Sequence, residues 1–362
     1  MNEIGSEFWT GCTPVSGEHD YSMRLSIIYD SCRYKVVETL SGRTALEHIV
    51  EILVGLGKTI VYLPAYCCHT MIEPFLSHGM QVKFYNVVYT TDGLHRVVNE
   101  NEVYDAILLM DYFGHTDVET LNIAQQAKQD EKIVIYDATH SMYSHVDYSP
   151  YDFIYGSYRK WVDINCGFMA WKKELANYEI SQNRDKNRYA DMRKQFFDLK
   201  SAFMSGGAVN KDDFLPLVNE AETILELEYH HQMPDERSKV ILRTTDEGYI
   251  ISKRRSNARV LTEAINEIND ERVQCVSPLL NTFDTSLFVP VLVSPNIRDE
   301  LRRYLINKEI YCPVHWPQTD QHDVEAARRL FEEELSLICD QRYDEHDMIR
   351  IVDSITKYLN IN

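Results

Sequence analysis

Apolar residues in the first half of the chain follow two alternating periods. Residues 44–57 (TALEHIVEILVGLG) carry apolar side chains at positions 46, 49, 50, 53, 54 and 56. This spacing predicts a helix with one apolar stripe that ends at the glycines. The next run, TIVYLPAY, is typical of a buried strand, and TMIEPFLSHG predicts a second helix.

The alternation then continues toward the middle of the chain. QVKFYNV, DAILLMDYFG and KIVIYDATH are predicted strands, and LNIAQQAKQD is a predicted helix between the last two. Continuous apolar strands separated by helices are typical of a parallel sheet that is covered on both faces. Such sheets bind ligands beyond the carboxyl ends of their strands. We therefore search those ends for functional residues.

The pattern changes at about residue 175. Residues 175–265 are mostly charged and helical, with KDDFLPLVNEAETILELEYH as the clearest amphipathic stretch. A smaller α+β unit follows: TSLFVPVLV predicts a strand, IRDELRRYLINKEIYCPVHW a helix and then a strand, and DEHDMIRIVDSITKYLN a closing helix. We predict a large α/β domain with a helical connection in residues 1–245 and a small C-terminal α+β domain in residues 246–362.

Composition narrows the class of protein. The chain has 362 residues, of which 44% are hydrophobic and 26% charged, as in ordinary globular proteins. Its net charge of -19 disfavours binding to nucleic acid or anionic membranes. No apolar run is long enough to cross a bilayer, and the N-terminus lacks the features of a secretory signal. The eight cysteines form no C-x-x-C or Cys/His cluster. We expect reduced thiols, a cytoplasmic protein and no metal.

The first candidate site residues lie in SGRTAL (41–46), where a Ser-Gly turn leads into a helix. Free backbone N–H groups and the helix dipole favour a phosphate there, and Thr44 adds a hydroxyl. The simpler interpretation is a helix N-cap by Ser41 or Thr44.

Asp137 directly follows the strand KIVIY, and His140 stands three residues later. A carboxylate at the end of a buried strand needs a partner, because burying a lone charge is costly. A protonated pyridine nitrogen is one such partner, and a local backbone cap is the alternative. His140 could stack on a ring or bind a phenolate oxygen, although a single histidine is more often structural.

The run YDFIYGSYRKW (151–161) ends in Ser157, Arg159 and Lys160. Lys160 could be a solvated surface lysine. Its bulky neighbours instead favour a shielded ammonium, whose pKa desolvation and Arg159 would lower, and such lysines form imines with cofactor aldehydes. In LPAYCCH (63–69), Tyr66 is a weaker candidate for covering one face of a ring.

A phosphate cradle, Asp137, His140 and then Ser157-x-x-Lys160 follow the order of a pyridoxal phosphate site. The sequence resembles the fold type I pyridoxal-phosphate enzymes, and among them the DegT-type sugar aminotransferases. The resemblance runs from SGRTALEHI through VIYDATHSM and YDFIYGSYRKWVDINCGFMAW to VHWPQ and EELSLICDQRYDEHDM. It leaves about residues 175–245 poorly matched. Where the family has a Thr-aromatic pair, this chain has Cys67-Cys68.

The resemblance implies a large domain with a mainly parallel, seven-stranded sheet and a homodimer. It also implies a role for individual residues: Lys160 binds the cofactor and shuttles protons, Asp137 holds the pyridine nitrogen protonated, and His140 lies near the phenolic oxygen. Thr44 and Ser157 match phosphate ligands.

The resemblance implies transfer of an amino group from an amino acid to a keto sugar, in polysaccharide or amino-sugar biosynthesis. We expect glutamate as the donor and a nucleotide-linked sugar as the acceptor. Arg43 beside the phosphate turn, Arg159 and Arg342 are the cations expected to hold cofactor or substrate. The alternatives are transamination or elimination on an amino acid, and a pyridoxal-phosphate-binding protein without turnover.

Overall fold

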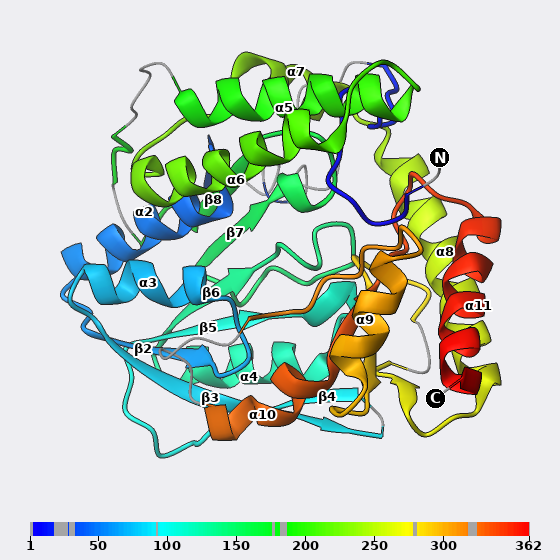
Figure 1. The fold of residues 1–362 in the computed structure, drawn as a ribbon. Helices are drawn as coiled ribbons and strands as arrows, with labels where there is room; N and C mark the ends of the chain where they lie inside the picture. Colours follow the sequence, from blue (N-terminus) through cyan, green and yellow to red (C-terminus); the bar gives the residue numbers. More distant parts are fainter. Residues whose placement is uncertain are drawn as a thin grey trace.

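An eight-stranded sheet forms the centre of the protein (Figure 1). The computed structural model describes residues 3–17, 28, 33–91, 93–175, 178–181, 187–277, 281–317 and 324–361. The sheet has one strand more than the seven expected. Its strands, in spatial order, are β1 (Tyr34–Thr39), β8 (Gly167–Lys172), β7 (Phe153–Ser157), β6 (Ile133–Asp137), β5 (Ala106–Met110), β2 (Ile60–Pro64), β3 (Gln81–Thr90) and β4 (Gly93–Val97).

The five strands from β7 to β3 in this order are parallel to their neighbours, whereas β8 and β4 pair antiparallel at the two sides. Every residue of β5, β6 and β7 is buried. This explains why these segments read as unbroken apolar runs, because both faces of a parallel sheet are covered. The prediction of a mainly parallel α/β sheet is confirmed.

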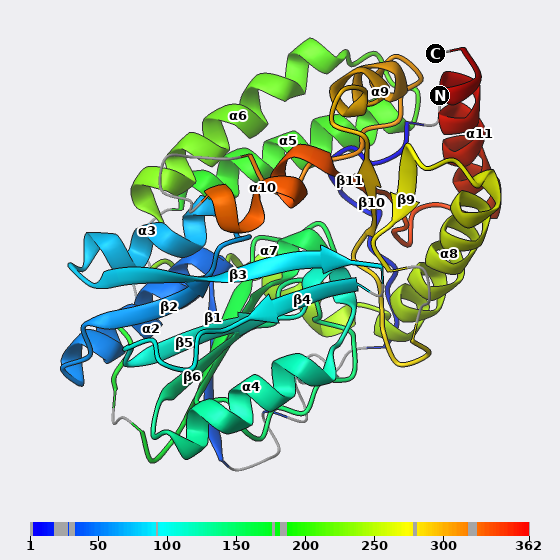
Figure 2. The same cartoon turned by 90° about the horizontal axis from the view of Figure 1, so that it is seen from below.

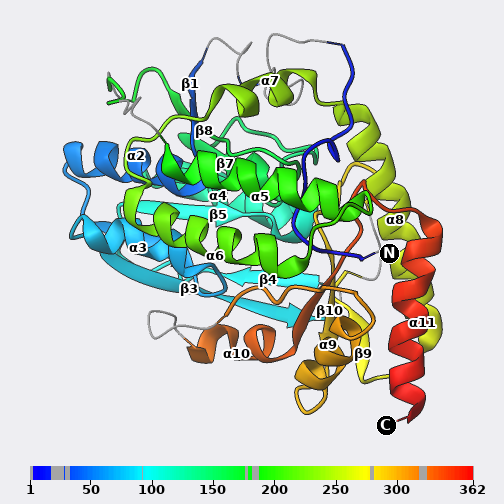
Figure 3. The ribbon, with the colours of Figure 1, turned by 45° about the horizontal axis from the view of Figure 1, so that its top comes forward.

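Helices cover both faces of the sheet. α2 (Gly42–Gly55), α3 (His69–Ser77), α5 (Arg188–Met204), α6 (Lys211–Glu228) and α7 (Glu236–Thr244) lie on one side. Figure 3 shows α5 and α6 side by side over the face that carries α2. α4 (Val118–Gln129) packs on β5 and β6 from the opposite face (Figure 2).

A second, three-stranded sheet lies beside the first, in the order β11 (Glu334–Leu337), β10 (Val289–Val293), β9 (Val273–Cys275). It packs with α8 (Glu247–Ile268), α9 (Arg298–Ile306) and α11 (Glu345–Ile361) around a separate core. The strand expected after α9 is reduced to a bridge between Ile4 and Ile310. Pro313 cannot donate a ladder hydrogen bond, which limits pairing in this segment.

Two segments cross between these units. Ile4 belongs to the core of the small sheet. In α10 (Val324–Glu333), Leu330 and Phe331 belong to the core of the large sheet. Apart from these two segments, we propose a domain boundary between residues 245 and 246, just before α8.

Two features bear on the environment of the protein. No helix among the described residues is both long enough and apolar enough to cross a bilayer. The seven cysteines in the described part of the chain are thiols that form no disulfide there. Cys32 lies outside it.

Candidate functional site

The carboxyl ends of β6 and β7 meet the N-terminus of α2 at one cavity of about 150 Å³. Asp137 is the last residue of β6, and Lys160 ends the 3₁₀ turn Tyr158–Lys160 that directly follows β7. Because β6 and β7 are parallel neighbours, the two side chains reach the same edge of the sheet. The structure brings six predicted site residues to this cavity: Arg43, Asp137, His140, Ser157, Arg159 and Lys160.

Glycines allow α2 to approach the strands closely. A Cβ at Gly167 would lie 2.4 Å from the carbonyl carbon of Ser41 and 2.7 Å from the nitrogen of Gly42. A Cβ at Gly42 would lie 3.2 Å from the Cβ of Ser157. The helix N-terminus can rest on β7 and β8 only because these positions lack side chains.

The first turn of α2 supplies donors for an anion. Ser41 caps the helix, with its Oγ accepting from Thr44 N at 3.2 Å, so the capping interpretation holds for Ser41. The hydroxyl of Ser157 is buried and has no hydrogen-bond partner among the described residues, and the Arg43 Nε is in the same situation. Both residues line the cavity beside the N–H groups of the first turn of α2. The hydroxyl, the guanidinium and these N–H groups together favour an anionic ligand.

Lys160 is exposed to the cavity but is closely surrounded by protein atoms. Burial lowers the pKa of its ammonium, and the neighbouring charge of Arg159 lowers it further. Lys160 makes no hydrogen bond or ion pair within the part of the chain that the structure describes. It is therefore an available amine with an increased neutral fraction, which favours nucleophilic or proton-transfer chemistry.

Asp137 is only 4% exposed. Its Oδ1 accepts from the backbone N of Thr139 at 2.8 Å, as a local cap would. Burial raises the pKa of the Asp137 carboxyl, against the opposing hydrogen bonds from Thr139. No cation pairs with this carboxylate among the described residues, so the site would be stabilised by a ligand that brings a positive charge.

His140 is held in one orientation. Its Nδ1 accepts from the backbone N of Phe113 at 3.2 Å, where Phe113 adopts a positive φ of 57°. Its ring stacks on Trp316, with centroids 5.4 Å apart and planes at 25°. Burial, followed by the charge of Lys160, lowers the pKa of His140 to about 3. The neutral ring therefore carries its proton on Nε2, which can donate to an oxygen.

Arg159 is held by α6. Its Nη1 donates to both carboxylate oxygens of Glu222, at 2.8 and 3.0 Å, and to Tyr189 Oη at 3.3 Å. The Glu222 carboxylate raises the pKa of Arg159 well above its usual value. Arg159 thus reaches the cavity as a compensated charge, whereas Arg43 has no ion-pair partner among the described residues and stacks on the ring of Tyr229.

The structure does not bring three other predicted residues to the cavity lining. Thr44 is buried and donates its hydroxyl to the carbonyl of Tyr229, so it holds the helix rather than presenting a hydroxyl. Tyr66 is also buried, and its hydroxyl donates to the carbonyl of His315. Arg342 pairs with Asp340 and binds N-terminal carbonyls, with its charge satisfied elsewhere.

Residues that were not assigned to the site also line the cavity. Cys68, at the N-cap of α3, stands where the resembled family has its aromatic residue. Burial alone would raise the pKa of the Cys68 thiol, but hydrogen bonds from His69 and Thr70 and the charge of Lys160 bring it to about 7. Trp316 and Glu222 come from segments distant in sequence, and only the tertiary fold places them here.

A larger cavity of about 740 Å³ lies between α8 and residues 281–286. Arg255, Arg259 and Thr262 line it. It has no lysine and no carboxyl end of a parallel strand, so the smaller cavity is the better candidate for chemistry despite its size.

No protein-family profile matches the chain, and no curated protein matches it in sequence. Solved structures do share its fold. Helicobacter pylori PseC, an aminotransferase involved in the biosynthesis of pseudoaminic acid, matches with a TM-score of 0.62 and 13% identity over 100% of both chains.

Two further structures extend the comparison. Bacillus subtilis NtdA with bound cofactor PMP has a TM-score of 0.63 and 14% identity over 92% of this chain and 80% of that one. A DegT DnrJ EryC1 StrS aminotransferase from Brucella abortus has a TM-score of 0.58 and 16% identity over 94% and 91%. The chain therefore has the fold of these aminotransferases, and the predicted fold class is confirmed.

Proposed function

We propose that the protein is a pyridoxal-phosphate-dependent aminotransferase that moves an amino group from an amino acid to a keto sugar. Glutamate is our first choice of donor, and a nucleotide-linked sugar is our choice of acceptor. The observation that carries the proposal is the convergence of Lys160 and Asp137 on one cavity from adjacent strand ends. Neither has an ion-pair partner within the described residues. The shared fold with these aminotransferases supports the same class of reaction.

The residues of the cavity fit this cofactor at three points. The buried Asp137 carboxylate would hold the pyridine nitrogen in its protonated form. The unpartnered hydroxyl of Ser157 and the N-terminus of α2, with Arg43 beside them, would hold the phosphate. Lys160 would bind the aldehyde. All three predicted contacts therefore have a suitable group in this structure.

Pyridoxal phosphate, when bound, supplies an electron sink for charge that develops on the amino donor. The Nζ of Lys160 would take the proton from the α-carbon of the donor, and its lowered pKa increases the fraction of neutral amine that can do so. Asp137 would keep its negative charge beside the ring nitrogen throughout. His140 would donate from Nε2 toward the phenolic oxygen, because its Nδ1 is already occupied by Phe113.

Substrate binding by this acidic chain requires local cations. Arg43 is the cavity arginine that has no ion-pair partner within the described residues, and we propose that it binds a carboxylate or phosphate of the substrate beside the cofactor phosphate. Arg159 would serve the same purpose only after its bond to Glu222 is exchanged for one to the ligand. The acceptor as a nucleotide-linked keto sugar rests on the resemblance to the DegT-type enzymes and on the structural neighbours.

The proposal is tested by absorbance spectroscopy of the protein loaded with pyridoxal phosphate while a panel of amino acids is added. Glutamate should convert the cofactor to its amine form with release of 2-oxoglutarate, and a keto sugar nucleotide should reverse the change. Lys160→Ala is the control and should not cycle. A protein that binds the cofactor but cycles with no donor is a binder without turnover. Release of ammonia from the donor would indicate elimination instead.

A further inference from the structure

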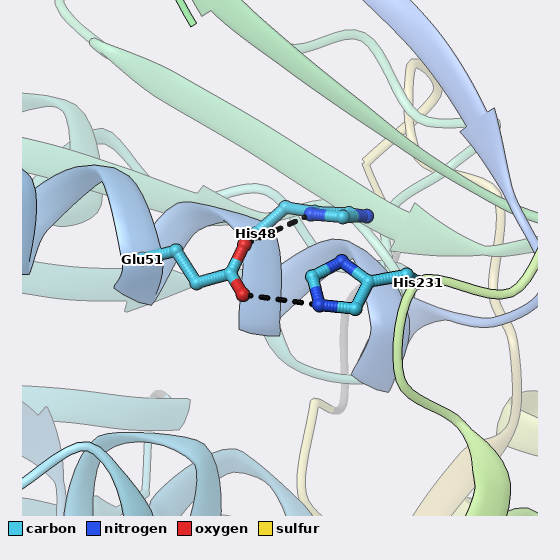
Figure 4. A group of neighbouring side chains, drawn as sticks. All are labelled: His48, Glu51 and His231. Atoms are coloured by element: carbon cyan, nitrogen blue, oxygen red, sulfur yellow. Dashed lines mark hydrogen bonds and ion pairs between the residues drawn. The ribbon is translucent and has the colours of Figure 1, made fainter. Parts of the chain in front are cut away.

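We propose that His48, Glu51 and His231 form a binding site for Zn²⁺ or a similar divalent transition-metal ion, outside the cofactor cavity. Figure 4 shows the Glu51 carboxylate facing both imidazole rings, with one oxygen toward His48 and the other toward His231. His48 and Glu51 lie on one face of α2, and His231 comes from the segment that follows α6. This proposal differs from our expectation of a protein without metal. The two histidines are distant in sequence and come close only in the folded chain, so the sequence did not indicate the site.

The three side chains are spaced as ligands of one metal ion would be, with a different oxygen of Glu51 facing each histidine. His48 Nδ1 lies 3.3 Å from Glu51 Oε2, and His231 Nε2 lies 3.3 Å from Glu51 Oε1. The three ligand atoms all lie within 4.8 Å of one another. Tetrahedral zinc with bonds of about 2.0–2.1 Å places its ligands roughly 3.3 Å apart. Two imidazoles and one carboxylate are a known zinc ligand set that leaves a fourth position open.

Buried polar atoms without partners point to the same place. Glu47 is 2% exposed, and its Oε2 has no hydrogen-bond partner within the described residues. A carboxylate oxygen of Glu47 lies within 4.8 Å of one of Glu51. Glu47 Oε1 binds His230 and Glu51 contacts both site histidines, but Glu47 Oε2 is left over, and a cation there would offset the repulsion between the two carboxylates. His231 Nδ1 is a second buried atom that has no partner in the described part of the chain.

The ring nitrogens of the two histidines favour a transition-metal ion. His48 is 1% exposed, so its ring is held in place by the surrounding side chains with its Nδ1 facing Glu51. His231 adopts a φ of 55°, a left-handed conformation that is uncommon for residues other than glycine and is held here by the surrounding fold. Nitrogen ligands favour zinc and its neighbours over magnesium or calcium, which prefer oxygen.

The site would fix the chain that borders the cofactor cavity. Residues 229–231 run along α2, because Thr44 donates to Tyr229 and Glu47 binds His230 one turn further on. Tyr178 reaches the same cluster: its hydroxyl donates to Glu51 Oε2 and lies 3.3 Å from His48 Nδ1. The last turn of α6, just before this segment, lines the cavity. A metal here would anchor the helical region that the resembled family does not match.

The test is metal binding by untagged protein, since a polyhistidine tag would itself bind zinc. The protein is purified with its cofactor, treated with a chelator and titrated with ZnCl₂ against a chromophoric competitor. We expect one zinc per chain, a rise in melting temperature on loading, and no comparable effect of MgCl₂. Cobalt(II) should bind at the same stoichiometry and give the visible absorption of a tetrahedral site.

The decisive variants are Glu51→Gln and His231→Asn. Asparagine tolerates the left-handed backbone, so His231→Asn removes the ligand without adding strain. Both should weaken zinc binding by more than the roughly 10- to 100-fold loss caused by removing a group that only orients a ligand. His346→Ala, at an exposed histidine on α11, is the control and should bind as the wild type does.

Two results would overturn the site. One is the absence of stoichiometric zinc and cobalt binding by the wild type, which would leave a hydrogen-bonded network in which Glu51 accepts from its neighbours. The other is binding of equal strength in wild type, Glu51→Gln and His231→Asn. Because the wild-type titration does not depend on the variants, poor folding of either variant leaves the first result decisive. Loss of transaminase activity alone would not bear on this site.

Discussion

The guanidinium of Arg159 lies 2.8 Å from the carboxylate of Glu222, and this ion pair connects the turn that carries Lys160 to α6. The two charges shift the pKa of Lys160 in opposite directions: Arg159 lowers it, and Glu222 raises it. The pair is partly exposed, so its contribution to the free energy of unfolding should be no more than about 1 kcal/mol. Its main effect is therefore on the chemistry of the lysine.

Opposite shifts in pH dependence are expected from the two halves of this pair. Arg159→Gln removes the positive charge, so the pKa of Lys160 should rise and less neutral amine should be present at a given pH. Glu222→Gln removes the negative charge, so the pKa should fall. The measurement is the rate of pyridoxal phosphate uptake as a function of pH. Shifts in the same direction, or none, would show that these charges do not control the amine.

Lys160 should be the attachment point of the cofactor. Reduction of the loaded protein with borohydride, followed by peptide mapping, should place the phosphopyridoxyl group on Lys160. Lys172, at the end of β8, is a useful comparison because its ammonium is engaged by Asp152 at 3.3 Å. A label on any other lysine, or no label, would remove the basis of the proposed function.

Asp137→Asn should separate cofactor binding from turnover. The substitution keeps the shape but removes the charge that would hold the ring nitrogen protonated, so activity should fall at least about 100-fold while part of the binding survives. Asp147→Asn is a matched control, because Asp147 also accepts from the backbone two residues on but lies exposed outside the cavity. Near-normal turnover in Asp137→Asn would reduce this residue to a structural cap.

Much of this site could be predicted because its parts are local. Asp137 and Lys160 each follow a strand whose unbroken apolar run is visible in the sequence, and parallel strands bring their ends to one edge. The Ser-Gly turn before α2 is equally local. The strand ends and the helix start that are visible in the sequence therefore predicted most of the residues that line the cavity.

The remaining contacts depend on tertiary packing and could not be predicted in this way. Glu222 reaches Arg159 only because α6 folds back over the cavity, and its sequence shows just an amphipathic helix. Thr44 and Tyr66 were chosen for their chemistry, but their hydroxyls satisfy backbone carbonyls of Tyr229 and His315. A sequence pattern does not show which buried hydroxyl is already bonded.

Close packing at Gly167 gives a prediction about stability. In Gly167→Ala the added Cβ would meet the backbone of Ser41 and Gly42, which cannot rotate away, so we expect a loss of at least about 2 kcal/mol in the free energy of unfolding. Gly55→Ala, at the end of α2, meets nothing within 4 Å and should be neutral or slightly stabilising. Chemical denaturation of both variants measures the difference. Equal stabilities would mean that α2 does not rest on β8 as described.

The last prediction concerns assembly. Fold type I enzymes build their sites at a dimer interface, so we expect a homodimer with a contact of the obligate kind, on the order of 2,000 Å² or more. Here, however, α6 of the same chain already lines the cavity through Glu222, Leu225 and Glu226. Light scattering after size exclusion, at micromolar protein, should give twice the mass of the 42.3 kDa chain. A monomer that retains its cofactor would contradict the dimer and would indicate that α6 replaces the partner as the cover of the site.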